Sequence, residues 1–207
     1  MHIDLKQHFD QALQIYTSND YVADLMDARK QYFSLIGQAI EEDEDYEPTM
    51  NSFNDWYLLQ YIAKKSIRTW IKDYLLNNGV DDEIIDTFND YNHSLFECLG
   101  NTMSGCHQFY DILHDKKITL DKEHPPLALI KRDIFIGRIL NYKNQSYMLP
   151  GMSVLPKEAK KILKHEVVRI IGMKNHIKEI KFLFQVEGFK NKYKRYRHLD
   201  VSKIFRF

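Results

Sequence analysis

The chain has 207 residues, of which 44% are hydrophobic and 13% aromatic, a composition too rich in core-forming side chains for a disordered protein. Five prolines and eight glycines are few for this length, which argues for long regular elements and against an all-β sandwich. The formal net charge of zero conceals two opposite halves, because residues 1–100 hold 7 Lys/Arg against 19 Asp/Glu and residues 101–207 hold 22 against 10.

Residues 4–40 predict two helices. Apolar residues at spacings of four, four and three form one helix face in the first: Leu5, Phe9, Leu13 and Tyr16. A second apolar series follows over 22–40. Ser18-Asn19-Asp20 separates the two and supplies a helix cap.

A strongly acidic segment comes next. Six of the seven residues before Pro48 are carboxylates: Glu41, Glu42, Asp43, Glu44, Asp45 and Glu47. Because proline ends a helix when it falls in the interior, we interpret 41–48 as a solvated loop. Two roles stay open for it. The loop either keeps a helix terminus soluble, or its six carboxylates bind a cation or a basic protein partner.

Residues 50–92 predict further core helices. An apolar and aromatic series runs from Phe53 to Leu75 at helical spacing and stops at Asn77-Asn78-Gly79, which suits a helix C-terminus. Asp81-Asp82-Glu83 then begins a shorter helix, since carboxylates interact favourably with the positive end of the helix dipole. The helical region therefore extends to about residue 92.

Residues 93–155 predict a small β module. Short apolar segments lie near 95–99, 107–113, 118–120, 127–140 and 146–149, and turn residues separate them. About five strands of this length suit a small bent antiparallel sheet or a partly closed barrel. Such a sheet needs helices to cover one of its faces.

Residues 156–184 predict a basic amphipathic helix, because the apolar series from Leu163 to Phe184 keeps spacings of three and four and the lysines avoid it. Two alternatives remain open. Gly172 can divide the helix in two, and the β-branched residues of 167–171 can instead form a strand.

Several short segments also occur in a familiar order: FNDWY (53–57), SLFEC (94–98), DIL (111–113), KRDIFIGRIL (131–140), MLP (148–150) and LP (155–156). Over roughly residues 50–165 the chain resembles a family of uncharacterised bacterial proteins in which a helical domain precedes a small β module. The resemblance implies a bacterial intracellular protein with an α+β fold and brings no catalytic residues. Some relatives carry a Cys-rich metal-binding tail, which this chain replaces with a basic one.

The basic tail is the first candidate binding site. Cations and aromatic rings alternate in it, and seven residues are candidates for nucleic-acid binding: Lys190, Lys192, Tyr193, Lys194, Arg195, Tyr196 and Arg197. Lysine and arginine neutralise phosphates, whereas tyrosine rings stack on unpaired bases. A second interpretation is that the rings pack on the helical region while the cations face the acidic segment or water. A third is that the tail binds an acidic protein or a membrane surface.

A weaker candidate is the Cys/His group of the β module, formed by Cys98, Cys106, His107, Asp111 and His114. In a helix, His107, Asp111 and His114 share a face, but the surrounding residues favour a strand, in which they do not. The spacing of the two cysteines is not that of a zinc ribbon. We therefore assign no metal ligand, catalytic residue or cofactor.

These patterns predict an α+β protein with an acidic helical region (1–92), a small β module (93–155) and a basic helix and tail (156–207), either separate or one compact unit. The most economical function is non-catalytic binding of RNA, DNA or a ribonucleoprotein through the tail. The alternative is a protein-interaction adaptor that uses 41–47 or the basic helix. With no signal-peptide pattern, no apolar run of about 18 residues and two cysteines, we expect a cytoplasmic protein without a membrane span.

Overall fold

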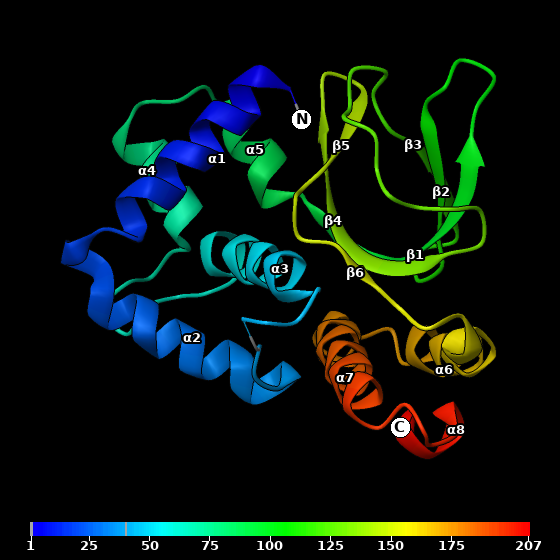
Figure 1. The fold of residues 1–207 in the computed structure, drawn as a ribbon. Coiled ribbons are helices and arrows are strands. Elements are labelled where there is room, and N and C mark those ends of the chain that lie inside the picture. The colour runs from blue at the N-terminus through cyan, green and yellow to red at the C-terminus, as the bar shows by residue number, and fades with distance from the viewer. Residues whose placement is uncertain (1, 40) are drawn as a thin grey trace.

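The computed structural model describes residues 2–39 and 41–207. The elements form three groups (Figure 1). The helices α1 (Ile3–Tyr16), α2 (Val22–Ile36), α3 (Tyr46–Leu59), α4 (Trp70–Asn77) and α5 (Asp82–Asn89) lie on one side. A curled sheet contains β1 (Asn92–Asn101), β2 (His107–Asp111), β3 (Lys116–Thr119), β4 (Ile134–Tyr142), β5 (Gln145–Met148) and β6 (Ser153–Val154). The helices α6 (Lys160–Gly172), α7 (His176–Arg195) and α8 (Val201–Ile204) lie beneath both.

The helical region confirms the sequence patterns and corrects two details. The predicted helix pair appears as α1 and α2. Pro48 does not end a helix: it occupies the third position of α3, where a backbone N–H has no partner within the helix in any case. The predicted apolar series from residue 53 to 75 is also not continuous, since residues 61–69 are irregular between α3 and α4.

The sheet is antiparallel in every paired strand, with the order β3-β2-β1-β4-β5 and β6 added to β4. It curls into a half-barrel, in agreement with the expected bent sheet (Figure 1). A bulge between Cys98 and Gly100 adds to the bend of β1. The strand expected over 127–140 begins only at Ile134. The fold class is α+β, as predicted.

The two faces of the half-barrel belong to different cores, because successive strand residues point to opposite sides. Phe96, Phe109 and Phe135 fill the inner face. Leu95 and Ile136, from the same strands, pack instead against α6, α7 and α8. The C-terminal helices therefore cover the outer face, as expected for a sheet that needs helices on one of its faces.

The basic C-terminal segment forms two helices instead of one. α6 ends at Gly172, and Asn175 caps α7 with a side chain that accepts a hydrogen bond from the Lys178 amide. The single-helix prediction is wrong, as is the alternative strand over 167–171, and the division at Gly172 is confirmed. Among the described helices, none combines the length and apolar character required to cross a bilayer.

The backbone just before β6 lies very close to α3. The amide of Gly151 donates a hydrogen bond of 3.0 Å to Oδ2 of Asp55. A Cβ atom at this glycine lies 2.5 Å from that oxygen and 2.6 Å from Cα of Ser52, distances that real side chains do not adopt. Only glycine fits here.

We therefore expect Gly151→Ala to lower the free energy of unfolding by about 2 kcal/mol or more, because overpacking and a lost hydrogen bond combine. Urea denaturation followed by circular dichroism measures the change. The control is Gly172→Ala at the end of α6, where no heavy atom lies within 4 Å and alanine is the better helix former. Equal stability of the Gly151 variant and the wild type contradicts the steric argument.

Candidate functional site

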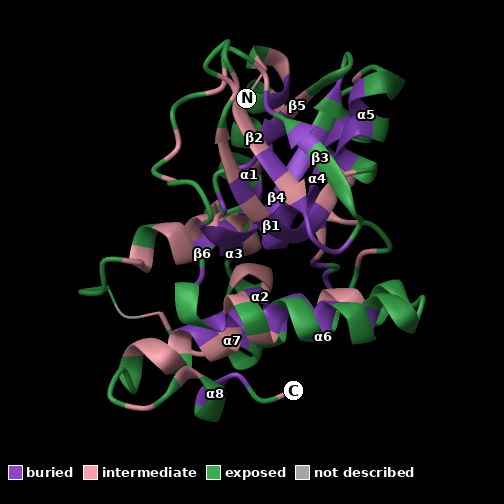
Figure 2. Cartoon of the chain, turned by 90° about the vertical axis from the view of Figure 1, so that its right-hand side faces the viewer, coloured by how far each residue is buried: buried purple, intermediate pink, exposed green. Residues whose placement is uncertain are grey.

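The outward face of α7 carries a stripe of exposed polar residues, most of them cationic. The stripe consists of Lys178, Lys181, Gln185, Lys192 and Arg195, which are spaced to lie along one side of the helix. At 1.5 Å per residue it extends over roughly 26 Å. Figure 2 shows exposed positions along α7 and α6 on this side of the molecule. We call this set the cationic stripe.

The inner side of α7 holds one of the predicted nucleic-acid residues inside the protein. Lys190 is 5% exposed, and its Nζ lies 2.9 Å from Oδ2 of Asp45 and 3.1 Å from Oγ of Ser153. Lys194 also forms an ion pair with Asp45. Burial alone raises the pKa of Asp45, but the hydrogen bonds and charges of Lys194 and Lys190 lower it overall. Lys190 is therefore not accessible to a phosphate in this conformation.

The other six predicted residues differ in exposure. Tyr193 is half-buried and packs against Phe205, with ring centroids 6.5 Å apart. Lys194 is half-buried beside Asp45. The exposed members are Lys192, Arg195, Tyr196 and Arg197. The structure thus brings these four candidates to the surface and turns the remaining three wholly or partly inward.

The acidic segment contacts the basic helix through one residue. Asp45 is half-buried against α7, whereas the remaining candidate partner-binding residues are exposed: Glu41, Glu42, Asp43, Glu44 and Glu47. Two further acidic residues reach the C-terminal region, since Glu97 pairs with Lys160 at 2.8 Å and Lys164 at 2.7 Å. Asp133 lies 3.6 Å from the ammonium of Lys157. The opposite charges of the two halves therefore meet at Asp45 and Glu97, whereas Asp133 pairs with Lys157 within the basic half.

Most of the positive charge stays outside these contacts. Within the part of the chain that the structure describes, nine exposed cations of residues 156–207 have no ion pair: Lys161, Lys174, Lys178, Lys181, Lys192, Arg195, Arg197, Lys203 and Arg206. Charges of one sign on one surface create a potential that attracts anions. The surface of α6, α7 and the tail is therefore the strongest candidate anion-binding surface.

A buried charged cluster fixes the orientation of α7 below this surface. The Arg138 side chain of β4 is 1% exposed and donates a hydrogen bond of 2.9 Å from Nη2 to Oε1 of Gln60. Asp55 of α3 and Glu187 of α7 are buried near it. Tyr32 of α2 donates a hydrogen bond of 3.4 Å to Oε2 of Glu187.

Burial controls the protonation of this cluster. It raises the pKa of Asp55 to about 7, against the opposing charge of Arg138. It also raises the pKa of Glu187, which Arg138 and Lys190 oppose. The pKa of His93 is lowered, first by burial and then by the Arg138 charge. The sequence analysis missed this cluster, although single charged residues within apolar elements, such as Asp55 and Arg138, are a usable signal.

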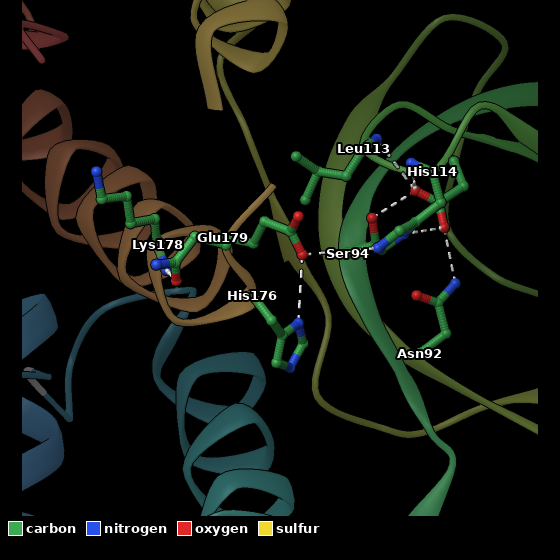
Figure 3. Close-up of polar contacts among 9 residues, drawn as sticks. Asn92, Ser94, Leu113, His114, His176, Lys178 and Glu179 are labelled. Carbon is green, nitrogen blue, oxygen red and sulfur yellow. Dashed lines mark hydrogen bonds and ion pairs between the residues drawn. The ribbon is translucent and has the colours of Figure 1, made fainter. Parts of the chain in front are cut away.

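The weaker Cys/His candidate group is only partly assembled. Asp111 and His114 meet through the turn after β2, with His114 Nδ1 3.0 Å from Asp111 Oδ2 (Figure 3). Asn92 and Ser94 also donate hydrogen bonds to the Asp111 carboxylate. The bond to Asp111 raises the pKa of His114. The carboxylate of Glu179 lies 3.9 Å from His114 Nε2 and 3.2 Å from His176 Nδ1, so that this network connects β2 to the start of α7.

The remaining members of that group have separate surroundings. Cys98 is buried in the inner core of the sheet, and burial raises the pKa of its thiol. Cys106 lies in the β1–β2 hairpin beside Ser104. Nε2 of His107 accepts a hydrogen bond from the Leu127 amide. Over residues 2–39 and 41–207, no three His, Cys, Asp or Glu side chains are arranged to hold a metal ion.

Comparison with known proteins places the chain in a family. The model of a family of unknown function (DUF7986) matches residues 19–203, which include all elements from α2 to α7. The chain belongs to this family. No curated protein and no solved structure matches it. The α+β arrangement described above is therefore a structure of the DUF7986 family, and function has to be argued from its surface.

The ion pairs of Asp45 give a stability prediction for this family member. Asp45→Ala leaves the buried Lys190 ammonium without its carboxylate, so we expect the free energy of unfolding at pH 7 to fall by about 1–3 kcal/mol. Thermal and urea denaturation measure it. Asp43→Ala is the matched control, because Asp43 is exposed, and surface changes of this kind stay within about 0.5 kcal/mol. An Asp45 variant as stable as the control contradicts the assigned role.

The raised pKa of Asp55 gives a second prediction. Between its usual value of 3.8 and about 7, the native state binds a proton that the unfolded state releases. Asp55 therefore contributes stability at acidic pH that is lost as the pH rises through this interval, up to about 4 kcal/mol at 1.36 kcal/mol per pH unit. Glu187, whose pKa is also raised, makes stability fall as the pH rises. His93, whose pKa is lowered, makes stability rise with pH, because its buried ring is neutral at pH values at which the unfolded state still binds a proton.

The difference between the wild type and Asp55→Asn isolates Asp55 from these neighbours. We expect the stability of the wild type relative to the variant to decrease steadily from pH 4.5 to pH 7.5. Urea denaturation at intervals of half a pH unit measures this difference. A difference that is constant, or that increases with pH, means that Asp55 is ionised throughout.

Proposed function

We propose that this protein binds RNA or DNA through the cationic stripe of α7 and the tail that follows it. The observation that carries the proposal is the set of exposed lysines and arginines without ion pairs, which continues along α7 into residues 196–206. Phosphates spaced along a strand match a linear series of cations better than they match a single pocket. Binding releases the counterions of the nucleic acid, which is a favourable process at low salt.

The internal ion pairs support the same proposal. Asp45, Glu97 and Asp133 form ion pairs with five lysines of the C-terminal region: Lys157, Lys160, Lys164, Lys190 and Lys194. The exposed cations have no comparable structural role. A solvated surface alone does not require charges of one sign to gather on one side of a neutral protein, whereas an anionic partner does.

The proposal predicts a specific loss of binding. Replacing Lys178, Lys181, Lys192 and Arg197 together with Ser removes four candidate phosphate contacts. We expect the affinity for a 20-nucleotide single strand to fall, and the slope of log K against log salt concentration to become shallower by about 3, at roughly 0.7 per contact. Fluorescence anisotropy at several salt concentrations measures both quantities.

The matched control changes the net charge equally on other surfaces. It replaces Lys30, Lys65, Lys117 and Lys122, all exposed, with Ser. Unchanged binding by the α7 variant, or an equal loss by the two variants, overturns the proposal. If a protein partner recovered from cell extract stays bound after nuclease digestion while no oligonucleotide binds, the adaptor alternative replaces it.

A further inference from the structure

A groove lies between the last turn of α2 and the outward face of α7. Its volume is about 440 Å³, within the range of sites that bind small molecules. Its apolar wall consists of Leu35, which is 52% exposed, and the half-buried ring of Phe189. The ring of Tyr196, 45% exposed, stands at the end of the groove. Large apolar side chains are thus available to a ligand beside the cations of α7.

Gly188 explains why the groove is open. A Cβ atom at this position lies 3.2 Å from the Leu35 carbonyl oxygen, so glycine lets α2 and α7 approach each other closely. It also adds no side chain to cover the apolar wall. α2 ends at Gly37, which also lines the groove and has a φ of 86°, in the left-handed region that favours glycine.

Cations form the rim of the groove. Lys192 and Arg195 belong to the cationic stripe and also line this groove. One guanidinium nitrogen of Arg195 donates a hydrogen bond of 3.0 Å to the Gln38 carbonyl, which holds the side chain at the rim. A guanidinium has five N–H donors, so donors remain for an anion. The carboxylate of Asp45 on the neighbouring side is already neutralised by Lys190 and Lys194.

An apolar wall, an exposed aromatic ring and a cationic rim together match the two parts of a nucleotide. A base offers flat apolar faces, and its flanking phosphates are anionic. In a duplex those faces are stacked and inaccessible to a groove. The carboxylates of an acidic peptide match the rim, but Asp and Glu side chains offer no flat group to the wall and the Tyr196 ring.

We propose that this groove accommodates one unpaired base of a single strand, stacked on Tyr196 and against Leu35, with its flanking phosphates on Lys192 and Arg195. This inference rests on the proposed function and adds a preference for single-stranded over double-stranded nucleic acid. The stripe supplies affinity for the phosphates of any strand. The groove supplies the preference for single-stranded over double-stranded nucleic acid.

The test compares two uncharged substitutions with a matched control. Tyr196→Ala and Leu35→Gln remove the ring and the apolar wall without changing charge. Ile15→Gln at the end of α1 is the control, because Ile15 has a similar exposure and α1 leads into the start of α2, at the opposite end of that helix from the groove (Figure 1). The probes are a 12-nucleotide single strand with one 2-aminopurine and the same sequence as a duplex. Anisotropy measures affinity, and 2-aminopurine fluorescence reports stacking.

We expect each groove variant to bind the single strand roughly tenfold more weakly, since one base stack is worth about 1–3 kcal/mol, and to bind the duplex as the wild type does. The 2-aminopurine fluorescence is expected to be quenched by the wild type and the Ile15 control, and not by the Tyr196 variant. Circular dichroism confirms that all variants are folded.

The outcomes separate the two proposals. Suppose that the variant without Lys178, Lys181, Lys192 and Arg197 loses binding. If the groove variants then weaken the binding of single strand and duplex equally, or weaken the binding of neither, the groove inference is overturned and the proposed function stands. If the stripe variant binds as the wild type does, both are overturned. Competition by poly-L-glutamate as effective as that of the single strand also overturns the groove inference, in favour of an acidic protein partner.

Discussion

The guanidinium of Arg138 is the group on which the arrangement of helices and sheet depends. A charge removed from water needs opposite charges and hydrogen bonds around it, or the fold loses several kcal/mol. Here the Gln60 side chain at the end of α3 accepts a hydrogen bond from the guanidinium, and the carboxyl groups of Asp55 in α3 and Glu187 in α7 interact with its charge. The surroundings of this one buried charge therefore connect α3 and α7 to β4.

This constraint also decides which side of α7 faces solvent. With Glu187 directed inward and about 100° of rotation per residue, Lys178, Lys181 and Lys192 lie roughly 120–180° around the helix from it. Three residues after Glu187, Lys190 shares its inner side and meets Asp45. The cationic stripe is thus a geometric consequence of the buried cluster.

The sequence predicted those features that depend on periodicity. Helices at 4–40, the bent antiparallel sheet and the basic C-terminal helices follow from spacings of three to four or from short separated apolar segments. Periodicity did not predict the irregular residues 61–69, because that segment keeps apolar residues although its backbone leaves the helix. Periodicity also did not show that Pro48 is compatible with a helix. Proline is tolerated in the first turn, and which residue begins α3 was not evident from the spacing of apolar residues.

Prediction of the candidate site was limited by a different factor. A run of lysines and arginines identifies a basic segment, but only tertiary contacts decide which of them turn inward. Lys190 and Lys192 look equivalent in the sequence, yet one is buried against Asp45 and the other is exposed. The groove was beyond sequence reasoning altogether, because its wall joins Leu35 to residues more than 150 positions away.

The contact between Tyr32 and Glu187 spans 155 residues of the chain, and it has a consequence for synthesis. As the polypeptide leaves the ribosome, α1 to α5 and the sheet emerge with Arg138 before Glu187 exists to compensate it. The buried cluster is therefore incomplete until α7 docks. Until then the apolar outer face of the half-barrel lacks part of its cover, and exposed apolar surface of this kind promotes aggregation.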